Sequence, residues 1–394
     1  MPRPLALLGN TPAFAEKLYV GRPNVGDRAA FLKRVEDMLD RNWLTNDGPF
    51  VQEFEKKLAA SVGVRHCIAM CNATIALEIA TRAMDLSGEV IVPSYTFIAT
   101  AHALQWQQIT PIFADIDERT HCLDPVAVER MITPRTTAIM GVHLWGQPCD
   151  VDALAEVARK HKLKLLFDAA HAFGCTYKGR QIGNNGDCEV FSFHATKFFN
   201  ALEGGAVTTN DDELARKMRL MRNFGFAGFD NVTYIGTNGK MTEVSAAMGL
   251  TNFDSLGDVV TVNSRNWDGY RVGLADIPGL SLFTPSDRDR WNHQYVVVEV
   301  GAGSPLTRDE YVDVLHAENV IARKYFWPGC HRMEPYRSLQ PHAGLLLPVT
   351  EQVAAKVFLL PSGTAMNAAS VATVCDILRS AAIDNTTVRQ RLSR

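Results

Sequence analysis

The chain has 394 residues, of which 46% are hydrophobic and 21% are charged, and its formal net charge is −3. This balance is typical of a folded globular protein and excludes a largely disordered chain. A near-neutral charge does not favour nucleic acid as the main partner, and no apolar run approaches the roughly 18 residues of a membrane helix. At roughly 100–200 residues per domain, the length predicts two domains.

The eight cysteines are scattered along the chain, without a C-x-x-C pair or a histidine cluster at zinc spacing. In a chain of this length they are expected to be buried thiols in a reducing cytoplasm rather than a disulfide framework. The first residues contain an apolar run that is too short for a signal peptide. The sequence therefore predicts a cytoplasmic protein without a bound metal.

The first 60 residues are expected to be helical and peripheral. Asp27 is a candidate N-cap for a helix that extends to Leu39. A turn at 46–49 then precedes a second amphipathic helix at 50–62.

From residue 66 to about residue 210, short apolar runs alternate with helical segments. The runs are 66–70, 89–93, 111–116, 137–144, 163–168, 188–193 and 206–209. Continuous apolarity indicates burial on both faces, which is what a parallel sheet covered by helices requires. The pattern predicts an α/β fold with one large, mostly parallel seven-stranded sheet.

After residue 210 the pattern changes to that of a smaller α+β segment. A helix is expected at 211–222, and another begins near Met241 after a glycine-rich loop at 223–240. Strands are expected at 293–300 and 320–326, helices at 308–318 and 364–381, and a polar, basic tail at the end. We therefore predict a large α/β domain at 1–258, including the N-terminal helical segment, and a small C-terminal domain at 259–394.

Ligands of open α/β sheets bind outside the carboxyl ends of the strands, so the residues that follow the strands are candidates for a site. Asn72, Ala73 and Thr74 follow the first strand and begin a helix, whose N–H groups and dipole favour an anion such as phosphate. Simple capping of that helix by Asn72 or Thr74 is the alternative. The absence of a G-x-G-x-x-G motif here gives no support for a dinucleotide site.

Two charged residues follow other strands of the predicted sheet. Asp168 ends the strand at 163–168, where it is either another helix cap or an anion paired with a cationic ligand group such as a protonated ring nitrogen. Lys197 follows the strand at 188–193. It is either an ordinary solvated charge or an amine that desolvation makes nucleophilic, able to form a Schiff base.

These parts together are what pyridoxal phosphate (PLP) requires: a phosphate cradle, a carboxylate for the pyridinium nitrogen and a Schiff-base lysine. An aromatic side chain that can stack on the ring is available in Ser94-Tyr95-Thr96-Phe97, after the second strand.

At this point the sequence resembles the DegT/DnrJ/StrS family of sugar aminotransferases, which have the PLP-dependent aspartate-aminotransferase fold. The resemblance covers nearly the whole chain and is carried by motifs in a fixed order. These are Asn42 to Thr45, Val92 to Phe97, Asp115 to Asp117, Val142 to Pro148, Asp168 to Ala172, Ser192 to Lys197, Glu203 to Gly205, Arg222 to Gly225 and Gly236 to Met241.

The resemblance implies catalytic roles for matching residues. Lys197 corresponds to the lysine that forms the Schiff base with PLP and later moves protons between cofactor and substrate. Asp168 corresponds to the carboxylate that keeps the ring nitrogen protonated, and His171 to a residue beside the ring hydroxyl. Phe97 corresponds to the aromatic side chain that stacks on the ring.

The resemblance also implies how the phosphate is bound. Ala73, Thr74 and Ser192 correspond to the phosphate cradle. Asn238 corresponds to a residue that reaches the phosphate of the neighbouring subunit's cofactor, which implies a homodimer with composite active sites. The usual Ser-Gly-Thr motif of the family is Asn72-Ala73-Thr74 here, and we expect phosphate binding to persist if the φ angle of Ala73 is negative.

The presence of Lys197 favours transamination, because this lysine is a histidine in the dehydratase relatives. Segments 192–200, 238–241 and 329–336 resemble the branch that transfers an amino group from L-glutamate to C4 of dTDP-4-keto-6-deoxyglucose, giving dTDP-4-amino-4,6-dideoxyglucose. Candidate contacts with the nucleotide sugar are His194, Lys240, Tyr325 and His331. Ordinary packing is the alternative for His331 and for Tyr336.

The sequence is also compatible with two other functions. One is the same chemistry on a 3-keto, UDP-linked or GDP-linked sugar or on a cyclitol. The other is a catalytically inert, PLP-binding regulatory protein, against which the presence of Lys197 and Asp168 argues.

Overall fold

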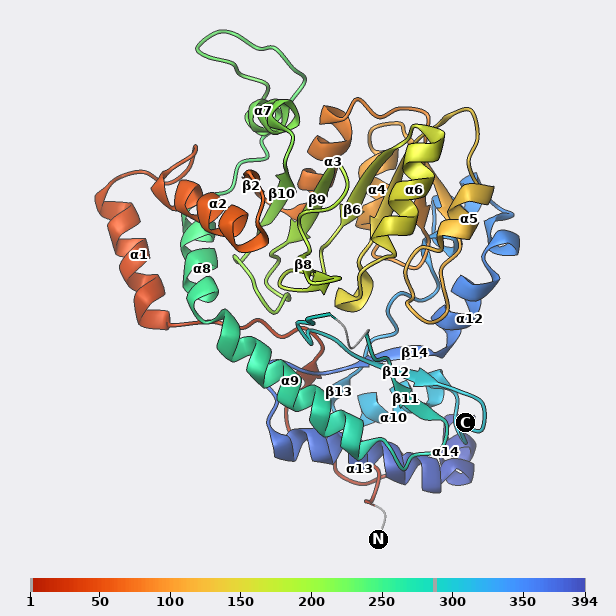
Figure 1. The fold of residues 1–394 in the computed structure, drawn as a ribbon. Helices are drawn as coiled ribbons and strands as arrows, with labels where there is room; N and C mark the ends of the chain where they lie inside the picture. Colours follow the sequence, from red (N-terminus) through yellow and green to blue (C-terminus); the bar gives the residue numbers. More distant parts are fainter. Residues whose placement is uncertain (1–2, 286–288, 394) are drawn as a thin grey trace.

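The computed structural model describes residues 3–285 and 289–393, and its largest element is a seven-stranded sheet (Figure 1). In order across the sheet, the strands are β2 (His66–Met70), β10 (Gly205–Thr209), β9 (Cys188–Ser192), β6 (Lys164–Asp168), β5 (Thr136–Val142), β3 (Glu89–Pro93) and β4 (Thr110–Ala114). The strands from β9 to β4 pair in parallel, whereas β10 is antiparallel to both of its neighbours. The predicted large, mostly parallel seven-stranded sheet is confirmed.

Helices cover both faces of this sheet. Successive side chains of a strand point to opposite sides, so a continuously apolar strand has to be covered on both. One face is covered by α3 (Ala73–Ala83), α4 (Ala99–Gln105) and α7 (Asp212–Met221), and the other by α2 (Pro49–Val62), α5 (Pro125–Arg130), α6 (Val151–His161) and α8 (Glu243–Asp254). In β6, Leu166 belongs to the hydrophobic core on the first face, whereas Leu165 and Phe167 belong to the core on the second. This double burial explains why the strands are continuously apolar.

The peripheral helix predicted near the N-terminus is α1 (Arg28–Asp40). The side chain of Asp27 accepts hydrogen bonds from the backbone N–H groups of Ala29 and Ala30, which confirms the predicted N-cap. The glycine-rich loop between α7 and α8 projects beyond the sheet at the top of Figure 1.

The C-terminal part is an α+β unit, as expected. Its antiparallel sheet contains β11 (Leu280–Leu282), β12 (Val296–Val300) and β14 (Val357–Leu360). Its helices are α9 (Leu256–Gly273), α10 (Arg308–Ala317), α11 (Tyr336–Leu339), α12 (Pro348–Lys356), α13 (Ala368–Ile383) and α14 (Asn385–Leu392). The short elements of the chain are β1 (Leu18–Tyr19), paired with β13 (Val320–Ile321), β7 (Thr176–Tyr177), paired with β8 (Arg180–Gln181), and the 3-10 turns η1 (Ala6–Leu8), η2 (Leu144–Gly146), η3 (Cys330–Arg332) and η4 (Ala343–Leu346).

Three expectations for this C-terminal part were wrong in detail. The strand expected at 320–326 ends at Ile321, because its partner β1 is only two residues long. The strand expected at 293–300 begins at Val296, because the Gln294 N–H bonds to the side chain of Asn292 and the Gln294 side chain bonds to the loop residue Phe198, not to a neighbouring strand. The expected tail is partly the helix α14, whose Val388 is buried.

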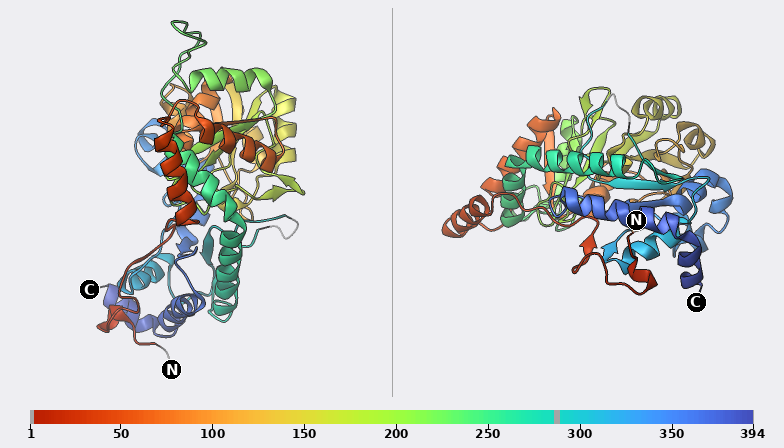
Figure 2. Two further views of the ribbon diagram at one scale, coloured as in Figure 1. Left: turned by 90° about the vertical axis from the view of Figure 1, so that its left-hand side faces the viewer. Right: turned by 90° about the horizontal axis from the view of Figure 1, so that it is seen from below.

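The segment that contains η1 and β1 lies against the C-terminal elements rather than on the large sheet. The carboxylate of Glu318 accepts hydrogen bonds from the N–H groups of Ala6 and Ala13, each at 2.6 Å. Both ends of the chain lie on this side of the molecule (Figure 2). The predicted boundary between residues 258 and 259 falls within α9 and stays a prediction. None of the described helices combines the length and apolarity needed to cross a membrane.

Candidate active site

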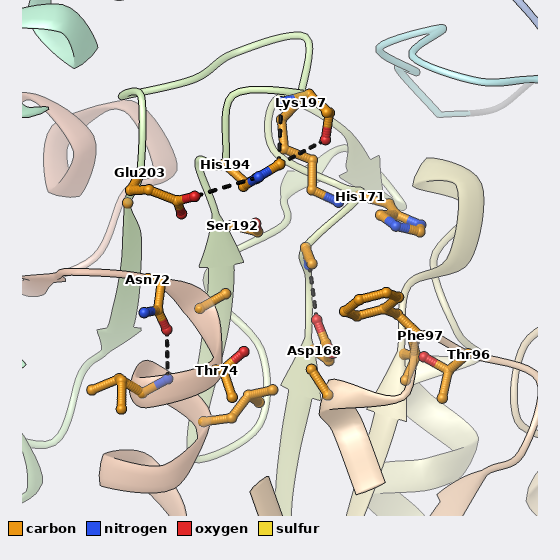
Figure 3. Close-up of a pocket in the computed structure, with 18 of the residues that line it drawn as sticks. Asn72, Thr74, Thr96, Phe97, Asp168, His171, Ser192, His194, Lys197 and Glu203 are labelled. Atoms are coloured by element: carbon orange, nitrogen blue, oxygen red, sulfur yellow. Dashed lines mark hydrogen bonds and ion pairs between the residues drawn. The ribbon is translucent and has the colours of Figure 1, made fainter. Parts of the chain in front are cut away.

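A cavity of about 590 Å³ lies at the carboxyl ends of the parallel strands (Figure 3), within the roughly 300–1,000 Å³ typical of ligand sites. The predicted site residues that line it are Ala73, Thr74, Phe97, Asp168, His171, Ser192, His194, Lys197 and Tyr325. Three other predicted residues, which the structure also describes, lie outside this lining: Asn238, Lys240 and His331. The loops that follow the strands therefore meet at one site, as the strand-end argument predicts.

The first turn of α3 forms one side of the cavity. Asn72 Oδ1 accepts the N–H of Ile75 at 2.9 Å, so the capping alternative is correct for Asn72. Capping does not exclude an anion, because the first N–H groups of a helix have no partner within it, and Ala73 and Thr74 line the cavity. A Cβ atom on Gly205 would lie 2.5 Å from the carbonyl carbon of Asn72, so only glycine lets β10 approach this turn so closely.

Asp168 is buried at the end of β6, where two donors hold its carboxylate. Oδ2 accepts a hydrogen bond from Thr100 Oγ1 at 2.9 Å, and Oδ1 accepts one from the N–H of Ala170 at 3.0 Å. Burial raises the pKa of this carboxyl, while the Ala170 and Thr100 donors and the nearby charge of Lys197 oppose that shift. A buried carboxylate with two donors has acceptor capacity left for a cationic ligand group.

Lys197 lies on the opposite side of the cavity, in the loop after β9 (Figure 3). Burial lowers the pKa of its amine from 10.5 to about 8, and attraction to Asp168 offsets this only in part. A far larger fraction of this amine is therefore uncharged at neutral pH than is usual for lysine. Uncharged amine is the nucleophilic form, so the alternative of an ordinary solvated charge does not describe Lys197.

His171 is a buried, neutral imidazole. Burial, and next the charge of Lys197, lower the pKa of its ring well below 6.5. The backbone N–H of Trp145 donates to Nδ1 at 3.4 Å, which assigns the ring hydrogen to Nε2. The imidazole stacks with the Trp145 and Phe326 rings, at centroid distances of 5.9 Å in both cases. Nε2–H is therefore a fixed hydrogen-bond donor for a neutral or anionic oxygen.

The wall that faces the strand ends is aromatic and comes from the C-terminal part. Tyr295, Tyr325 and Phe326 line the cavity, and the hydroxyl of Tyr95 holds this wall by donating to the carbonyl oxygen of Tyr325 at 2.8 Å. Sequence reasoning missed Tyr295 and Phe326. Both lay within predicted strands, so no sequence signal separated them from core residues.

The side chains of His194 and Glu203 face each other at the mouth of the cavity. His194 Nε2 lies 3.4 Å from Glu203 Oε1, and His194 Nδ1 lies 2.8 Å from Thr196 Oγ1. Both members of the pair are largely exposed and line the cavity. They are thus available to a ligand that enters from solvent.

His331 is buried behind the cavity, with protein partners on both ring nitrogens. Nδ1 lies 2.6 Å from Ser94 Oγ, and Nε2 lies 2.7 Å from Glu351 Oε1. Tyr336 is also buried, and its hydroxyl bonds to His102 Nδ1 at 2.8 Å. These placements favour the packing alternative for both residues.

Asn238 and Lys240 belong to the projecting loop between α7 and α8. Lys240 Nζ donates to Asn238 Oδ1 at 2.6 Å and lies 4.6 Å from the centroid of the Phe224 ring. The loop is tied to the phosphate side of the site, because the N–H of Cys71 donates to the carbonyl oxygen of Gly239 at 2.9 Å. Neither side chain reaches into the cavity of its own chain.

Residues 26–379 match the DegT/DnrJ/EryC1/StrS aminotransferase family, and the chain belongs to this family. The family, the fold and the aminotransferase class expected from the sequence are therefore confirmed. Members of this family depend on PLP, which confirms the predicted cofactor.

Individual relatives are similar over most of their length. The dTDP-4-amino-4,6-dideoxy-D-glucose transaminase of Shigella dysenteriae is 39% identical over 347 residues, covering 87% of this chain and 93% of that protein. The GDP-perosamine synthase of Caulobacter vibrioides is 40% identical over 311 residues, covering 77% and 83%. The crystal structure of DesI in the presence of its TDP-sugar product is 50% identical, with a TM-score of 0.95 and 99% of both chains covered.

The cavity fits PLP on its own geometry. The close approach at Gly205 builds an anion cradle on α3, and buried Asp168 retains capacity for a cation. Phe97 has 58% of its surface exposed and lines the cavity, so a ring face is free to stack. The amine of Lys197 is available in its uncharged form.

Proposed function

We propose that this chain transfers the amino group of L-glutamate to C4 of dTDP-4-keto-6-deoxy-D-glucose, giving dTDP-4-amino-4,6-dideoxy-D-glucose. The observation that carries the transamination is the partly buried amine of Lys197, with its pKa lowered to about 8, in one cavity with Asp168. The choice of sugar is supported by the names of the transaminase from Shigella dysenteriae and of DesI with its TDP-sugar product.

Bound PLP supplies an aldehyde and an electron-withdrawing ring. Ala73, Thr74 and Ser192 would hold its phosphate, with the dipole of α3 favouring the negative charge. The Asp168 carboxylate would hold the proton on the ring nitrogen, and Phe97 would pack on the ring.

Protein groups supply the other steps. His171 Nε2–H would donate to the ring hydroxyl, and the lowered pKa of the imidazole keeps it a neutral donor. Lys197 Nζ would hold the cofactor covalently through its aldehyde carbon, with loss of water. As a free amine, Lys197 Nζ would carry the proton from the α-carbon of glutamate to that carbon, and in the second half of the cycle it would carry a proton from that carbon to C4 of the sugar. The apolar wall of Tyr295, Tyr325 and Phe326 limits water at this point.

The protein acts as a homodimer with composite sites. Support comes from the projecting loop, which exposes apolar side chains that water does not favour. These are Phe224, Phe226, Phe229, Val232 and Ile235. Asn238 and Lys240 bond to each other in the same loop, outside the cavity of their own chain, and this position suits contact with the phosphates bound by a second copy. Light scattering should give a dimer mass, and Phe229→Asp should shift it toward the monomer.

The function is tested with the cofactor-loaded protein, L-glutamate and a panel of keto sugars. The panel contains dTDP-4-keto-6-deoxyglucose, a GDP-linked 4-keto-6-deoxy sugar, a UDP-linked sugar and a dTDP-linked 3-keto sugar, with products identified by mass spectrometry and NMR. We expect amination at C4 of the dTDP sugar with the highest kcat/KM. Preference for the GDP sugar would replace our proposal with the second candidate, which the relative named GDP-perosamine synthase supports.

A regulatory protein without catalysis predicts a different result. Borohydride reduction would still leave the cofactor on Lys197, but L-glutamate would not convert the bound cofactor to its amine form. The glutamate half-reaction therefore separates an enzyme from an inert PLP-binding protein without any sugar present.

A further inference from the structure

The loop that carries Lys197 has little regular structure between β9 and β10. The N–H of Lys197 bonds to the carbonyl oxygen of His194 within the loop, and other backbone groups of the loop bond to side chains. Phe198, which directly follows Lys197, has both backbone polar groups bound by side chains from distant segments. Its carbonyl oxygen accepts a hydrogen bond from Asn24 Nδ2 at 3.0 Å, and its N–H donates to Gln294 Oε1 at 3.4 Å. The position of the Lys197 main chain therefore depends on residues outside the loop.

Three buried asparagines continue this arrangement, and we name Asn24, Asn200 and Asn252 the asparagine network. Asn200 Nδ2 donates to the carbonyl oxygen of Asn24 at 2.9 Å, and Asn252 Nδ2 donates to the carbonyl oxygen of Asn200 at 2.8 Å. The exposed fractions of the three residues are 5%, 2% and 6%. The network joins the segment before α1, the lysine loop and α8.

The amide of Asn24 is fixed at both ends. Its Oδ1 accepts hydrogen bonds from Thr364 Oγ1 at 2.7 Å and from the Thr364 N–H at 3.3 Å. With the oxygen engaged by Thr364, the NH₂ group points to Phe198 in one defined orientation. The backbone N–H of Thr364 keeps its bond to Oδ1 whatever side chain stands at this position, whereas Nδ2 acts on the lysine loop.

We propose that Asn24 and Asn200 are positioning residues for Lys197, which hold the backbone on its C-terminal side without touching substrate or cofactor. Neither asparagine lines the cavity. In the proposed function, Lys197 Nζ must reach the aldehyde carbon of the cofactor, the α-carbon of glutamate and C4 of the sugar. A displacement of a reacting group by about 1 Å costs on the order of 100-fold in rate. Hydrogen bonds from buried side-chain amides provide this precision and add no further charge near the amine. This inference rests on the proposed aminotransferase function.

The test compares Asn24→Ala and Asn200→Ala with Thr364→Val, a matched control that removes one bond to Asn24 but leaves its donation to Phe198. We expect kcat of the glutamate half-reaction to fall about 10- to 100-fold in both alanine variants, with KM changed less than about threefold. Thr364→Val should keep kcat within about threefold of the wild type. Thermal melting of all three variants measures any general loss of stability.

A second readout uses the cofactor-free protein. The rate at which trinitrobenzenesulfonate modifies Lys197, followed by peptide mass spectrometry against pH, gives the titration midpoint of its amine. A loosened loop exposes the amine to water, so the midpoint should rise in Asn24→Ala and stay unchanged in Thr364→Val. If the wild-type protein did not react with L-glutamate, the proposed function would be refuted. The titration would still test whether Asn24 positions Lys197, because it needs no cofactor.

Two results would overturn the proposal. One is an Asn24→Ala variant with wild-type kcat and an unchanged midpoint. The other is an equal loss in Thr364→Val and Asn24→Ala, which would indicate destabilisation alone. If Asn24→Ala does not fold, Asn24→Ser carries the same comparison, since serine keeps a polar side chain at this position but is too short to donate to the Phe198 carbonyl oxygen.

Discussion

The two walls of the cavity are built in different ways. One wall consists of residues at the ends of strands of the large sheet or in the loops and helix turns that follow, among them Asp168, Lys197 and the first turn of α3. The other consists of Tyr295, Tyr325 and Phe326, none of which lies in a strand or helix. The first wall presents charges and donors whose positions follow from the sheet, and the second presents apolar surface. We therefore propose that the first wall carries the chemistry and that the second wall contacts the sugar.

The largest expected effect is on the charged wall. Lys197→Met removes the amine that bonds to the cofactor and moves the proton, so turnover should fall about 10⁴-fold or more. Steady-state assay with L-glutamate and the keto sugar measures this loss. Lys178→Met, at an exposed lysine paired with Asp152, is the control and should remain as active as the wild type. Substantial turnover by Lys197→Met would contradict the division between the walls.

A smaller effect is expected from Asp168→Asn, which keeps the shape of the side chain and an acceptor for Thr100 but removes the negative charge. The proton on the cofactor's ring nitrogen then loses its partner, so kcat of the glutamate half-reaction should fall about 10²- to 10³-fold. Stopped-flow absorbance of the bound cofactor follows this step. A kcat within threefold of wild type would show that the charge of Asp168 is not needed.

The same contrast explains what the sequence could predict. Asp168 and Lys197 follow continuous apolar runs, and a buried strand fixes where its last residue emerges. Thr100, which bonds Asp168, lies inside a helix and carries no such signal. Tyr295 and Phe326 reach the cavity only through packing between segments that are distant in sequence. His331 is an example of a motif that predicted too much. Its motif suggested a contact with the ligand, whereas hydrogen bonds to Ser94 and Glu351 hold it behind the cavity.

A variant of the aromatic wall should affect the two half-reactions unequally. Tyr325→Ala removes apolar surface from the side opposite the strand ends, and we expect KM for the keto sugar to rise about 10-fold, since burial of an aromatic ring contributes about 1–3 kcal/mol. The rate of the glutamate half-reaction should change less than about threefold. Separate assays of the half-reactions measure both. If Tyr325→Ala slowed both half-reactions equally, the two walls would not differ in function.

The smallest expected effect concerns the stability of the cofactor-free protein. The pKa of Lys197 falls from 10.5 to about 8 on folding, so below pH 8 the folded state holds a proton that it binds less tightly than the unfolded state does. Between pH 8 and 10.5 the unfolded state binds more protons, and the contribution of this group to the free energy of unfolding therefore rises with pH. Burial of the charged amine lowers the free energy of unfolding, by the full amount at pH 7 and not at all above pH 10.5. Removing the amine should remove this cost.

Lys197→Met should thus melt a few degrees above the wild type at pH 7 when both lack the cofactor. The difference should narrow steadily toward pH 10, as measured by differential scanning calorimetry. Phe326→Ala is the matched comparison, because a phenylalanine side chain from the same aromatic wall carries no ionisable group, so its effect on melting should not follow this pH course. A constant difference between Lys197→Met and the wild type across this range would mean that the amine is not desolvated. Lys197 would then owe its reactivity to the cofactor alone, since the fold would not have lowered the pKa of its amine in advance.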